Sequence, residues 1–466
     1  MTAGEIQPKT DPVRGSAVYP IGSRVNEAGR LEVGGCDVVE VAREFGTPAY
    51  IYAEGDIRTR ARAYLDAFRA RTADFEVVFA SKAAPITAIL SLLGEEGLSA
   101  DVASGGELHT ALRAGVDPGR IHLHGNNKTE VELRLAVDAG VGHVICDSFA
   151  EITRLDSICA AAGARQRVLI RVTPGIKPDT HSYVQTGQLD SKFGFGLGDG
   201  LAARGVEAVG ASANLDLVGL HAHIGSQIFE LDPYVRTIEA LAELADPGWC
   251  ELLNVGGGLG IAYTAEDEPP AIEDYVEVNV RGVERVFERT PRILVEPGRS
   301  LVGNAGITAY TVGTVKEIPE VRTYVAVDGG MSDNLRPMLY GSRYEAIVAD
   351  RASEPADTMV TVAGMHCESS DIIVRDTRIA APREGDILVT PATGAYGYAM
   401  ANNYNGVPRP PVILCDGGDA RLVVRRETYD DLTARDVARP SPDPAAPGRE
   451  AEEAGGTFGI HGSGDG

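Results

Sequence analysis

The sequence predicts two folded parts, a (β/α)8 barrel followed by an antiparallel β-sandwich or β-barrel domain. Three observations carry this prediction. Short apolar runs alternate with helical patterns over residues 47–305, that stretch has the length of a closed barrel, and β-rich segments follow it. Strands and helices that alternate with short links indicate parallel strands joined by crossover helices. An open doubly wound sheet is the alternative, although it usually holds fewer strands.

Eight apolar runs are the expected barrel strands: 77–82, 100–104, 121–125, 143–147, 168–173, 217–223, 252–256 and 293–296. Helical patterns lie between most of them, at 85–96, 106–114, 129–139, 149–162, 234–244 and 272–288. Pro85 suits a first helical turn, because its missing N–H costs nothing there. Gly97, Gly115, Gly140 and Gly163 stand where helix ends favour a left-handed residue.

The second part is predicted from β-rich segments without regular helices between them, at 307–315, 323–328, 359–363, 387–390, 412–415 and 421–425. We expect residues 1–46 to complete this β domain. The tail is rich in Pro, Gly, Ala and Glu, so we expect it to be flexible. The predicted limits are therefore 1–46, 47–305 for the barrel, 306–438 for the β domain and 439–466 for the tail.

Composition excludes several classes of protein. Of 466 residues, 44% are hydrophobic and 24% charged, which is ordinary for a soluble globular chain. The net charge of −24 argues against nucleic acid or an anionic membrane as partner, but leaves room for a local anion site. No apolar run is long enough to span a bilayer and no secretory pattern opens the chain, so we predict a cytoplasmic protein. The six cysteines lack metal-site spacing, and no metal site is expected.

Polar residues follow nearly every predicted barrel strand, where (β/α)8 enzymes place their chemistry. The residues at these strand ends are Lys82, Asp101, His124, Asp147, Arg171, His223, Gly256–Gly258 and Glu296. Lys82 follows apolar residues in VFASK, and a desolvated lysine among charges can bond covalently to a carbonyl. Taken alone, a lysine at a strand end is usually a surface group whose stem lies along the protein, which is the alternative for Lys82.

The remaining strand-end residues have two interpretations each. Gly256–Gly258 could be a tight turn, or its backbone N–H groups could bind a phosphate with Ser226 as a further donor. His223 could be a core histidine, and the segment from Glu296 to Arg299 a simple turn. In combination, a lysine for an aldehyde, a phosphate site, a flat ring and a carboxylate for a ring nitrogen indicate pyridoxal 5'-phosphate.

At these residues the sequence resembles the fold type III family of pyridoxal-phosphate amino-acid decarboxylases. The resemblance covers the chain from about Thr47 to Asp436. Its motifs, in order, are FASKA, HGNNK, SKFGFG, HAHIGSQ, GGGLGI, EPGRS, DGGMSDNLRPMLYG, CESSD and GAYGYAMANNYN. The resemblance implies an N-terminal (β/α)8 barrel, a following β domain, bound pyridoxal 5'-phosphate, and a homodimer whose active sites lie across the interface.

The resemblance also assigns roles to residues. Lys82 is expected to hold the cofactor covalently, His223 to stack on its ring and Glu296 to pair with the ring nitrogen. The other cofactor-binding residues are expected to be Asp101, Arg171, Ser226, Gly258, Pro297, Gly298, Arg299 and Tyr396. The substrate-binding residues are expected to be Arg299, Arg336, Tyr340, Glu368 and Tyr396. Cys367 is expected to be the catalytic proton donor and, like Glu368, to come from the second subunit. A buried apolar cysteine is the alternative for Cys367.

The residues bear on the reaction as well. A carboxylate at the ring nitrogen keeps it protonated and favours decarboxylation, whereas an arginine there would favour racemisation. Arg299 and Arg336 suit a distal carboxylate and Glu368 a distal amine. We therefore expect decarboxylation of meso-2,6-diaminopimelate to L-lysine and CO2, the last step of lysine biosynthesis.

Other reactions stay open. One alternative is a decarboxylase of D-ornithine, D-lysine, arginine or carboxynorspermidine. A non-catalytic pyridoxal-phosphate carrier would have the barrel alone, whereas this chain adds a β domain with Cys367 and Tyr396. A barrel of unrelated chemistry is a third possibility.

Overall fold

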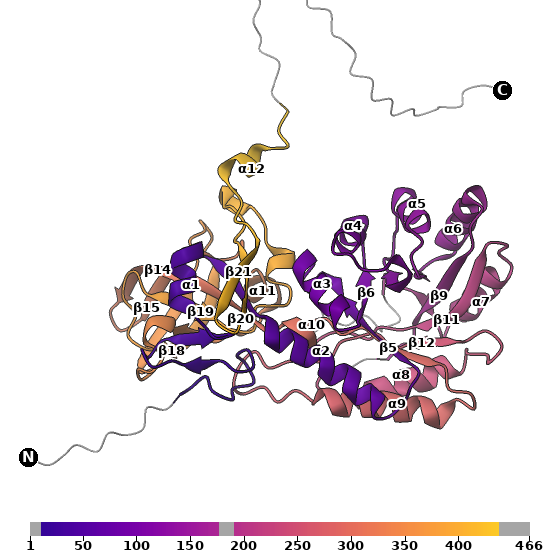
Figure 1. Ribbon diagram of the computed structural model, residues 1–466, viewed down its shortest axis with the longest axis horizontal. Helices are drawn as coiled ribbons and strands as arrows, with labels where there is room; N and C mark the ends of the chain where they lie inside the picture. Colours follow the sequence, from indigo (N-terminus) through magenta and orange to yellow (C-terminus); the bar gives the residue numbers. More distant parts are fainter. Residues whose placement is uncertain (1–10, 177–190, 438–466) are drawn as a thin grey trace, which may run out of the picture.

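The computed structural model describes residues 11–176 and 191–437, and shows a helix-covered barrel beside a β-rich domain (Figure 1). The predicted tail at 439–466 lies outside the described residues. The predicted fold class, a (β/α)8 barrel followed by a β domain, is confirmed. The four domain limits given above stay predictions.

Within the described residues, eight parallel strands close the barrel. They are β5 (Phe75–Ala80), β6 (Ser99–Val102), β7 (Ile121–Leu123), β8 (His143–Cys146), β9 (Gln166–Thr173), β11 (Leu215–His221), β12 (Leu252–Asn254) and β13 (Arg292–Val295). The ring closes because β13 pairs with β5, and β9 pairs with both β8 and β11. A short strand, β10 (Phe195–Gly196), adds to β9. The closed ring rules out the open doubly wound alternative.

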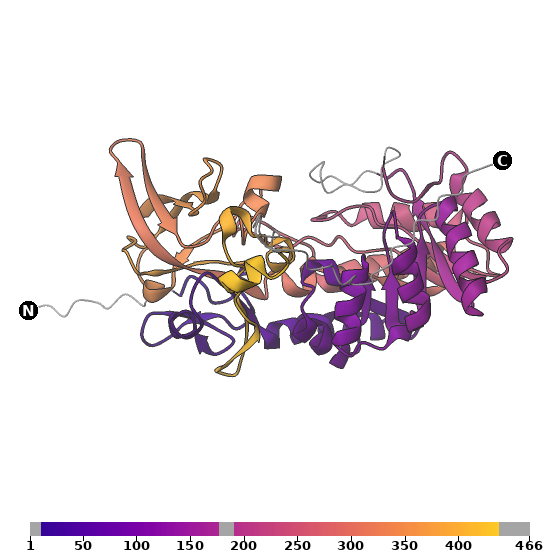
Figure 2. The same cartoon turned by 90° about the horizontal axis from the view of Figure 1, so that it is seen from above.

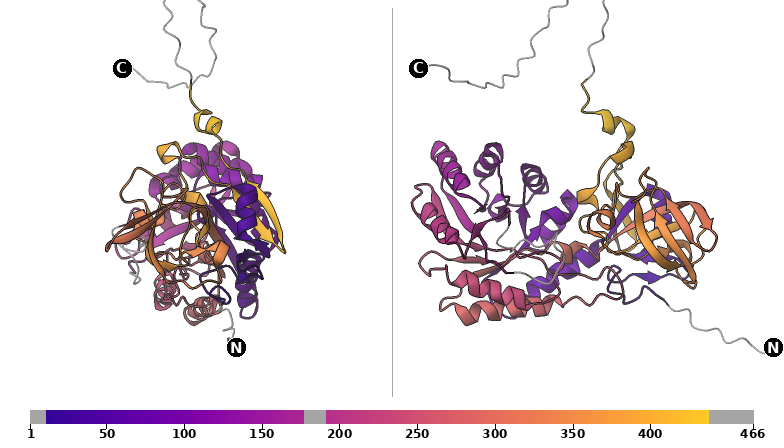
Figure 3. Two further views of the ribbon diagram at one scale, coloured as in Figure 1. Left: turned by 90° about the vertical axis from the view of Figure 1, so that its left-hand side faces the viewer. Right: turned by 180° about the vertical axis from the view of Figure 1, so that it is seen from behind.

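Helices surround the barrel strands (Figure 3). They are α2 (Glu54–Arg69), α3 (Thr87–Glu95), α4 (Gly105–Arg113), α5 (Glu130–Ala139), α6 (Phe149–Ala162), α7 (Leu201–Gly210), α8 (Asp232–Ala242) and α9 (Ile272–Val286), and the short α10 (Arg299–Val302) follows β13. Local sequence explains where several of them begin. The side chains of Ser104, Thr129 and Ser148 each accept a hydrogen bond from a backbone N–H three residues on, which caps α4, α5 and α6.

The helix ends agree with the glycine pattern, since Gly97, Gly115, Gly140 and Gly163 all have positive φ. The expectation for Pro85 is wrong, because α3 begins only at Thr87. The chain between β5 and α3 instead forms a single 3-10 turn, η1 (Ser81–Ala83), and then stays non-helical. This irregular link carries Lys82. Helices α2 and α7 are not among the predicted ones.

Several barrel strands end two residues earlier than predicted. β5 ends at Ala80 rather than 82, β11 at His221 rather than 223, and β12 at Asn254 rather than 256. The residues beyond these ends have apolar neighbours, which the pattern cannot distinguish from strand. In the structure they leave the hydrogen-bonded ladder, and their side chains and backbone are thereby free to line a site.

The β-rich domain is built around the long strand β14 (Gly306–Ile318). Its other strands are β4 (Ala49–Ala53), β15 (Arg322–Val327), β16 (Ile347–Val348), β17 (Thr358–Ala363), β18 (Ile372–Ile379), β19 (Ile387–Thr390), β20 (Val412–Asp416) and β21 (Asp419–Val424). Most pairings are antiparallel, but β15 pairs with β17, and β4 with β20, in parallel. Two short helices also belong to this part of the chain, α11 (Arg336–Tyr340) and α12 (Tyr429–Thr433).

The N-terminal elements lie against the β-rich domain (Figure 2). Strands β1 (Arg24–Val25), β2 (Leu31–Val33) and β3 (Cys36–Asp37) form a small sheet, and α1 (Val38–Phe45) follows them. Their buried side chains share one apolar core with β14, β15 and β19. No helix within residues 11–176 and 191–437 is both long and apolar enough to cross a bilayer.

Candidate active site

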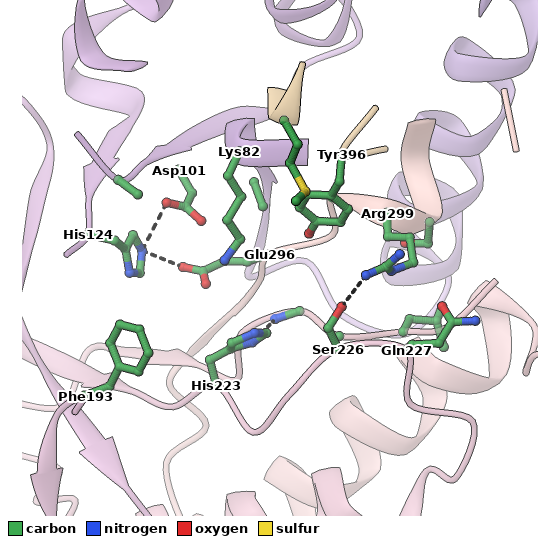
Figure 4. A pocket seen from close by; sticks show the side chains of 18 of the residues that line it. Lys82, Asp101, His124, Phe193, His223, Ser226, Gln227, Glu296, Arg299 and Tyr396 are labelled. Atoms are coloured by element: carbon green, nitrogen blue, oxygen red, sulfur yellow. Dashed lines mark hydrogen bonds and ion pairs between the residues drawn. The ribbon is translucent and has the colours of Figure 1, made fainter. Parts of the chain in front are cut away.

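A cavity of about 470 Å³ lies at the carboxyl ends of the barrel strands (Figure 4). The predicted site residues that line it are Lys82, Asp101, Arg171, His223, Ser226, Gly258, Glu296, Gly298, Arg299, Arg336, Tyr340 and Tyr396. Pro297, Cys367 and Glu368 do not line it. Arg336, Tyr340 and Tyr396 come from the part of the chain that follows the barrel, so both domains build the wall.

Lys82 extends from the 3-10 turn after β5 into this cavity, toward Glu296 (Figure 4). Burial disfavours its ammonium form, but Asp101, Tyr396 and Glu296 together outweigh burial and raise the pKa of Lys82 above its usual value. The turn itself is fixed, because Ser81 Oγ donates to Glu107 Oε2 at 2.9 Å. Lys82 is therefore an exposed amine in the cavity wall, close enough to Asp101 and Glu296 for their charges to favour its ammonium form.

Glu296, directly after β13, is held by three side chains. Asn254 Nδ2 donates to Oε1 at 2.6 Å, His221 Nε2 lies 3.2 Å from Oε2, and His124 Nε2 lies 2.9 Å from Oε1. Burial alone would raise the pKa of Glu296, but the two imidazoles outweigh it and hold the pKa well below its ordinary range. Glu296 is therefore a buried, oriented and ionised carboxylate.

Asp101 lies near the same ring nitrogen, with Oδ1 3.8 Å from His124 Nε2. Here burial prevails over the favourable field of His124 and raises the pKa of Asp101 to about 6. Burial lowers the pKa of His124, and the charges of Asp101 and Glu296 oppose that shift. Two carboxylates beside one imidazole thus have pKa values pushed in opposite directions, an arrangement typical of sites that handle protons.

Among the described residues, His124, His221 and Glu296 also bring possible metal ligand atoms within 4.8 Å of one another. Both carboxylate oxygens of Glu296 already face N–H donors. The cavity beside them is lined by the cationic side chains of Lys82 and Arg171. We therefore interpret this cluster as a support for an ionised carboxylate.

The turns after β11 and β12 form a narrow backbone cradle. Gly256 and Gly258 have φ values of 72° and 110°, which favour glycine. A Cβ on Gly258 would lie 2.5 Å from the carbonyl oxygen of Gly225, so no other residue fits without a shift. Ser226 Oγ accepts a hydrogen bond from Arg299 Nη2 at 2.9 Å across the cradle. Backbone that a ligand can approach closely, the hydroxyl of Ser226 and the guanidinium of Arg299 together suit the binding of a phosphate group.

His223 stands at the edge of this cradle, where Gly257 N donates to its Nδ1 at 3.3 Å. Burial lowers the pKa of His223 well below its usual value, so the ring is neutral. A neutral flat ring suits stacking on an aromatic ligand. Arg171, also in the cavity wall, lies over the ring of Phe193, 4.3 Å from its centroid, and 3.8 Å from Asp147. Phe193 belongs to the SKFGFG motif but was given no role from the sequence.

Two guanidinium groups lie farther along the cavity. Arg299 extends from α10 of the barrel and Arg336 from α11 of the second domain, and both are buried. The guanidinium of Arg299 lies 4.8 Å from the ring centroid of Tyr396, and that of Arg336 lies 5.9 Å from the ring of Tyr340. Both arginines donate to the hydroxyl of Tyr263, a residue that the sequence did not single out.

Cys367 and Glu368 are exposed and lie outside the cavity wall. The buried-cysteine alternative for Cys367 is therefore wrong. The backbone N–H of Cys367 donates to Asn405 Oδ1 at 3.2 Å, and the hydroxyl of Tyr404 donates to Glu368. These contacts fix the loop and leave the Cys367 thiol on the surface of this chain.

The comparisons with known proteins agree with this geometry. The family model of pyridoxal-dependent decarboxylases, pyridoxal binding domain, matches residues 54–303. The diaminopimelate decarboxylase of Bacillus subtilis is 47% identical over 426 residues, which are 89% of this chain and 97% of that protein. This chain belongs to the diaminopimelate decarboxylase family. It is thus a member of the pyridoxal-dependent decarboxylases, and the family predicted from the motifs is confirmed.

Other relatives extend the agreement. The diaminopimelate decarboxylase of Synechocystis is 42% identical over 459 residues, covering 93% of this chain and 96% of that protein. A crystal structure of the M. jannaschii diaminopimelate decarboxylase in complex with L-lysine has a TM-score of 0.84 and 33% identity. It covers 90% of this chain and 98% of that chain. The Helicobacter pylori enzyme with L-lysine has a TM-score of 0.78 and 31% identity, with coverages of 85% and 98%.

Proposed function

We propose that this chain decarboxylates meso-2,6-diaminopimelate to L-lysine and CO2, with pyridoxal 5'-phosphate as cofactor, as the last step of lysine biosynthesis. One observation carries the proposal. A single cavity places the Lys82 amine and the ionised Glu296 beside two buried guanidiniums, Arg299 and Arg336. The first pair suits the cofactor, and the second suits a carboxylate distant from the reacting carbon.

The residues present fit the cofactor. When bound, pyridoxal phosphate supplies an electron sink for the bond between the α-carbon and its carboxylate. Lys82 would hold its aldehyde carbon, and Glu296 would keep a proton on the ring nitrogen. His223 would stack on the ring face. The phosphate would lie among Ser226, Gly258 and the backbone from Glu296 through Pro297 and Gly298 to Arg299, with Asp101 and Arg171 beside the ring.

The substrate end of the cavity contains the two arginines and two tyrosines. Arg299 and Arg336 would bind the distal carboxylate, because a guanidinium binds a carboxylate through two parallel hydrogen bonds. Tyr340 and Tyr396 form the wall beside them. Glu368 would bind the distal amine. A substrate with both a distal amine and a distal carboxylate uses all of these groups, which favours diaminopimelate over ornithine, lysine, arginine or carboxynorspermidine.

The proposal includes a homodimer. Cys367 and Glu368 lie on the surface of this chain, so they would act in the cavity of a second copy, where the Cys367 thiol would give a proton to the α-carbon. Met365 and Tyr404 beside this loop are 53% and 43% exposed, and a dimer interface would cover them. We also propose a cytoplasmic location. All six cysteines are unpaired, as is usual in a reducing compartment.

Product analysis tests the function directly. Purified protein with pyridoxal phosphate is incubated with meso-diaminopimelate, and with the L,L isomer as control. Equal amounts of CO2 and L-lysine from the meso form support the proposal. If the cofactor binds but neither product forms, the substrate assignment is wrong. D-ornithine, D-lysine, arginine and carboxynorspermidine are then the next candidates.

A further inference from the structure

Tyr263 lies behind the two arginines and does not itself line the cavity. It follows the glycine-rich turn after β12 and is buried, with 6% of its surface exposed. Its hydroxyl accepts a hydrogen bond from Arg336 Nη1 at 2.5 Å and another from Arg299 Nη1. One oxygen atom therefore joins a guanidinium of the barrel to a guanidinium of the second domain.

Each guanidinium has one further contact that fixes its orientation. Arg299 Nη2 donates to Ser226 Oγ at 2.9 Å, and Arg336 Nη2 donates to Ser342 Oγ at 3.1 Å. The Nε atoms of both arginines are buried without a hydrogen-bond partner among residues 11–176 and 191–437. Each guanidinium therefore has an N–H donor that no described residue uses, and both side chains line the cavity.

Two buried positive charges held close together repel each other, unless an acceptor lies between them. Tyr263 supplies that acceptor from a fixed position. Its backbone N–H donates to Asp267 Oδ2 at 2.9 Å, and its ring packs edge-on against Tyr344, with centroids 5.2 Å apart. The guanidinium of Arg336 also lies 4.8 Å from the ring centroid of Tyr263. The hydroxyl therefore sets the spacing of the two guanidiniums.

We propose that Tyr263 is a positioning residue for substrate specificity, whose hydroxyl joins Arg299 and Arg336 into one clamp for the distal carboxylate. This inference rests on the proposed function, because it presumes a substrate with such a carboxylate. The charge balance of the site supports it. Burial would raise the pKa of Tyr263, but the two guanidiniums outweigh burial and lower it, as expected for an oxygen that faces two cations.

The test compares Tyr263→Phe with a matched control, Tyr344→Phe. Both changes remove one hydroxyl from a buried ring, but the hydroxyl of Tyr344 has no hydrogen-bond partner among the described residues. Steady-state kinetics give kcat and KM for meso-diaminopimelate. Competition experiments use L-lysine and 1,5-diaminopentane, which has the amines of lysine but no carboxylate. Thermal unfolding and cofactor titration establish that both variants fold and bind the cofactor.

We expect Tyr263→Phe to raise KM and the inhibition constant of L-lysine by about 10- to 100-fold, the range of a hydrogen bond to a charged group. The inhibition constant of 1,5-diaminopentane and kcat should change much less, and Tyr344→Phe should resemble the wild type. An unchanged KM, or equal weakening of lysine and diaminopentane, overturns the inference. Failure of the proposed function is a separate result, because wild-type protein would then form no lysine.

Discussion

The two ends of the barrel interior carry the same set of three side chains, one glutamate and two histidines, in different settings. At the carboxyl end, Glu296 is bounded by His124 and His221, whose rings are 4.8 Å apart. At the amino end, Glu76 Oε1 lies 3.3 Å from His122, and the ring of His143 lies 4.7 Å from that of His122. The layer between the two clusters is apolar and consists of Ile145, Leu169, Val218, Leu252 and Leu294.

The difference between the ends lies in access. The first cluster borders the cavity, whereas the cavity wall includes none of Glu76, His122 and His143. At the amino end, Ser99 Oγ donates to Glu76 Oε1 at 2.5 Å, and both ring nitrogens of His143 lack a hydrogen-bond partner within the described part of the chain. A glutamate with two histidines is therefore a chemical site at one end of the barrel and a packing layer at the other. Position at a strand end decides which.

The largest expected effect comes from Lys82. Lys82→Ala removes the amine that would hold the cofactor, so turnover of meso-diaminopimelate should fall by at least about 10⁴-fold. The visible absorbance of lysine-bound cofactor should disappear. Absorbance spectra and lysine formation measure the two effects. A persistent absorbance band would exclude Lys82 as the anchor.

The two glutamates give the sharpest test of the comparison. Glu296→Gln keeps the shape but removes the charge, so kcat should fall by about 10²- to 10³-fold while the cofactor stays bound. Glu76→Gln is the matched control at the other end, and its kcat should stay within about twofold of wild type. Steady-state kinetics and cofactor titration check both variants. Equal losses for the two would remove the distinction between the ends.

Cys367 tests whether the active site is shared. Cys367→Ala should lower kcat by about 10²-fold, because it removes only a proton donor. Mixing it with Lys82→Ala under subunit exchange should restore about one quarter of wild-type activity, since half of the dimers are then mixed and each has one intact site. The recovered activity is measured after equilibration. No recovery, in mixtures shown to exchange, contradicts a site built from two subunits.

The smallest effect concerns stability at the amino end. Burial, with further contributions from His122 and Arg167, lowers the pKa of His143 from its ordinary value of 6.5 to about 3. Arg292 lowers it further and Glu76 opposes them. The unfolded chain therefore binds a proton that the folded chain rejects, and stability falls as the pH drops below about 6.5.

That proton should destabilise the fold by about 2 kcal/mol between pH 7 and pH 5. His143→Phe should remove much of this loss and leave kcat unchanged. Urea unfolding of wild type and variant at the two pH values measures it, and carboxylates that titrate in this window, such as Asp101, contribute equally to both proteins. An identical pH dependence in wild type and variant would show that His143 does not carry the effect.

The sequence predicted the parts of the site that local pattern encodes. Lys82, His223 and Glu296 follow apolar runs, and the triple glycine follows another. His124 was noticed at the same rim but was given no role, and Asn254 was taken as strand interior. Their importance comes from contacts with Glu296, which follows β13. Asn254 lies on the neighbouring strand β12, whereas His124 follows β7, separated from β13 by two strands, and spacing along one strand reveals neither contact.

Other features depended on tertiary structure for the same reason. In the sequence, Tyr263 is one of several apolar residues in a turn. Only the fold places Arg299 and Arg336, from two domains, beside its hydroxyl. The interpretation of Pro85 was wrong because the chain that carries Lys82 forms a 3-10 turn and a non-helical link, so α3 begins only at Thr87. The preference of proline for a first helical turn is too weak to override this tertiary arrangement. The fold class was predictable because the alternation of strand and helix repeats along most of the barrel.

Strand β4 has a consequence for the order of events during synthesis. It leaves the ribosome before any barrel strand, yet its two ladder neighbours are β14, at residues 306–318, and β20, at residues 412–416. The barrel can close on its own residues while β4 still waits for both neighbours. Until β14 and β20 pair with it, β4 has unpaired edges that can form hydrogen bonds with other chains, although it is a buried, apolar strand in the folded protein. A chain whose synthesis stops before residue 412 would therefore have a complete barrel but no β20, and its strand β4 would be prone to pair with other chains.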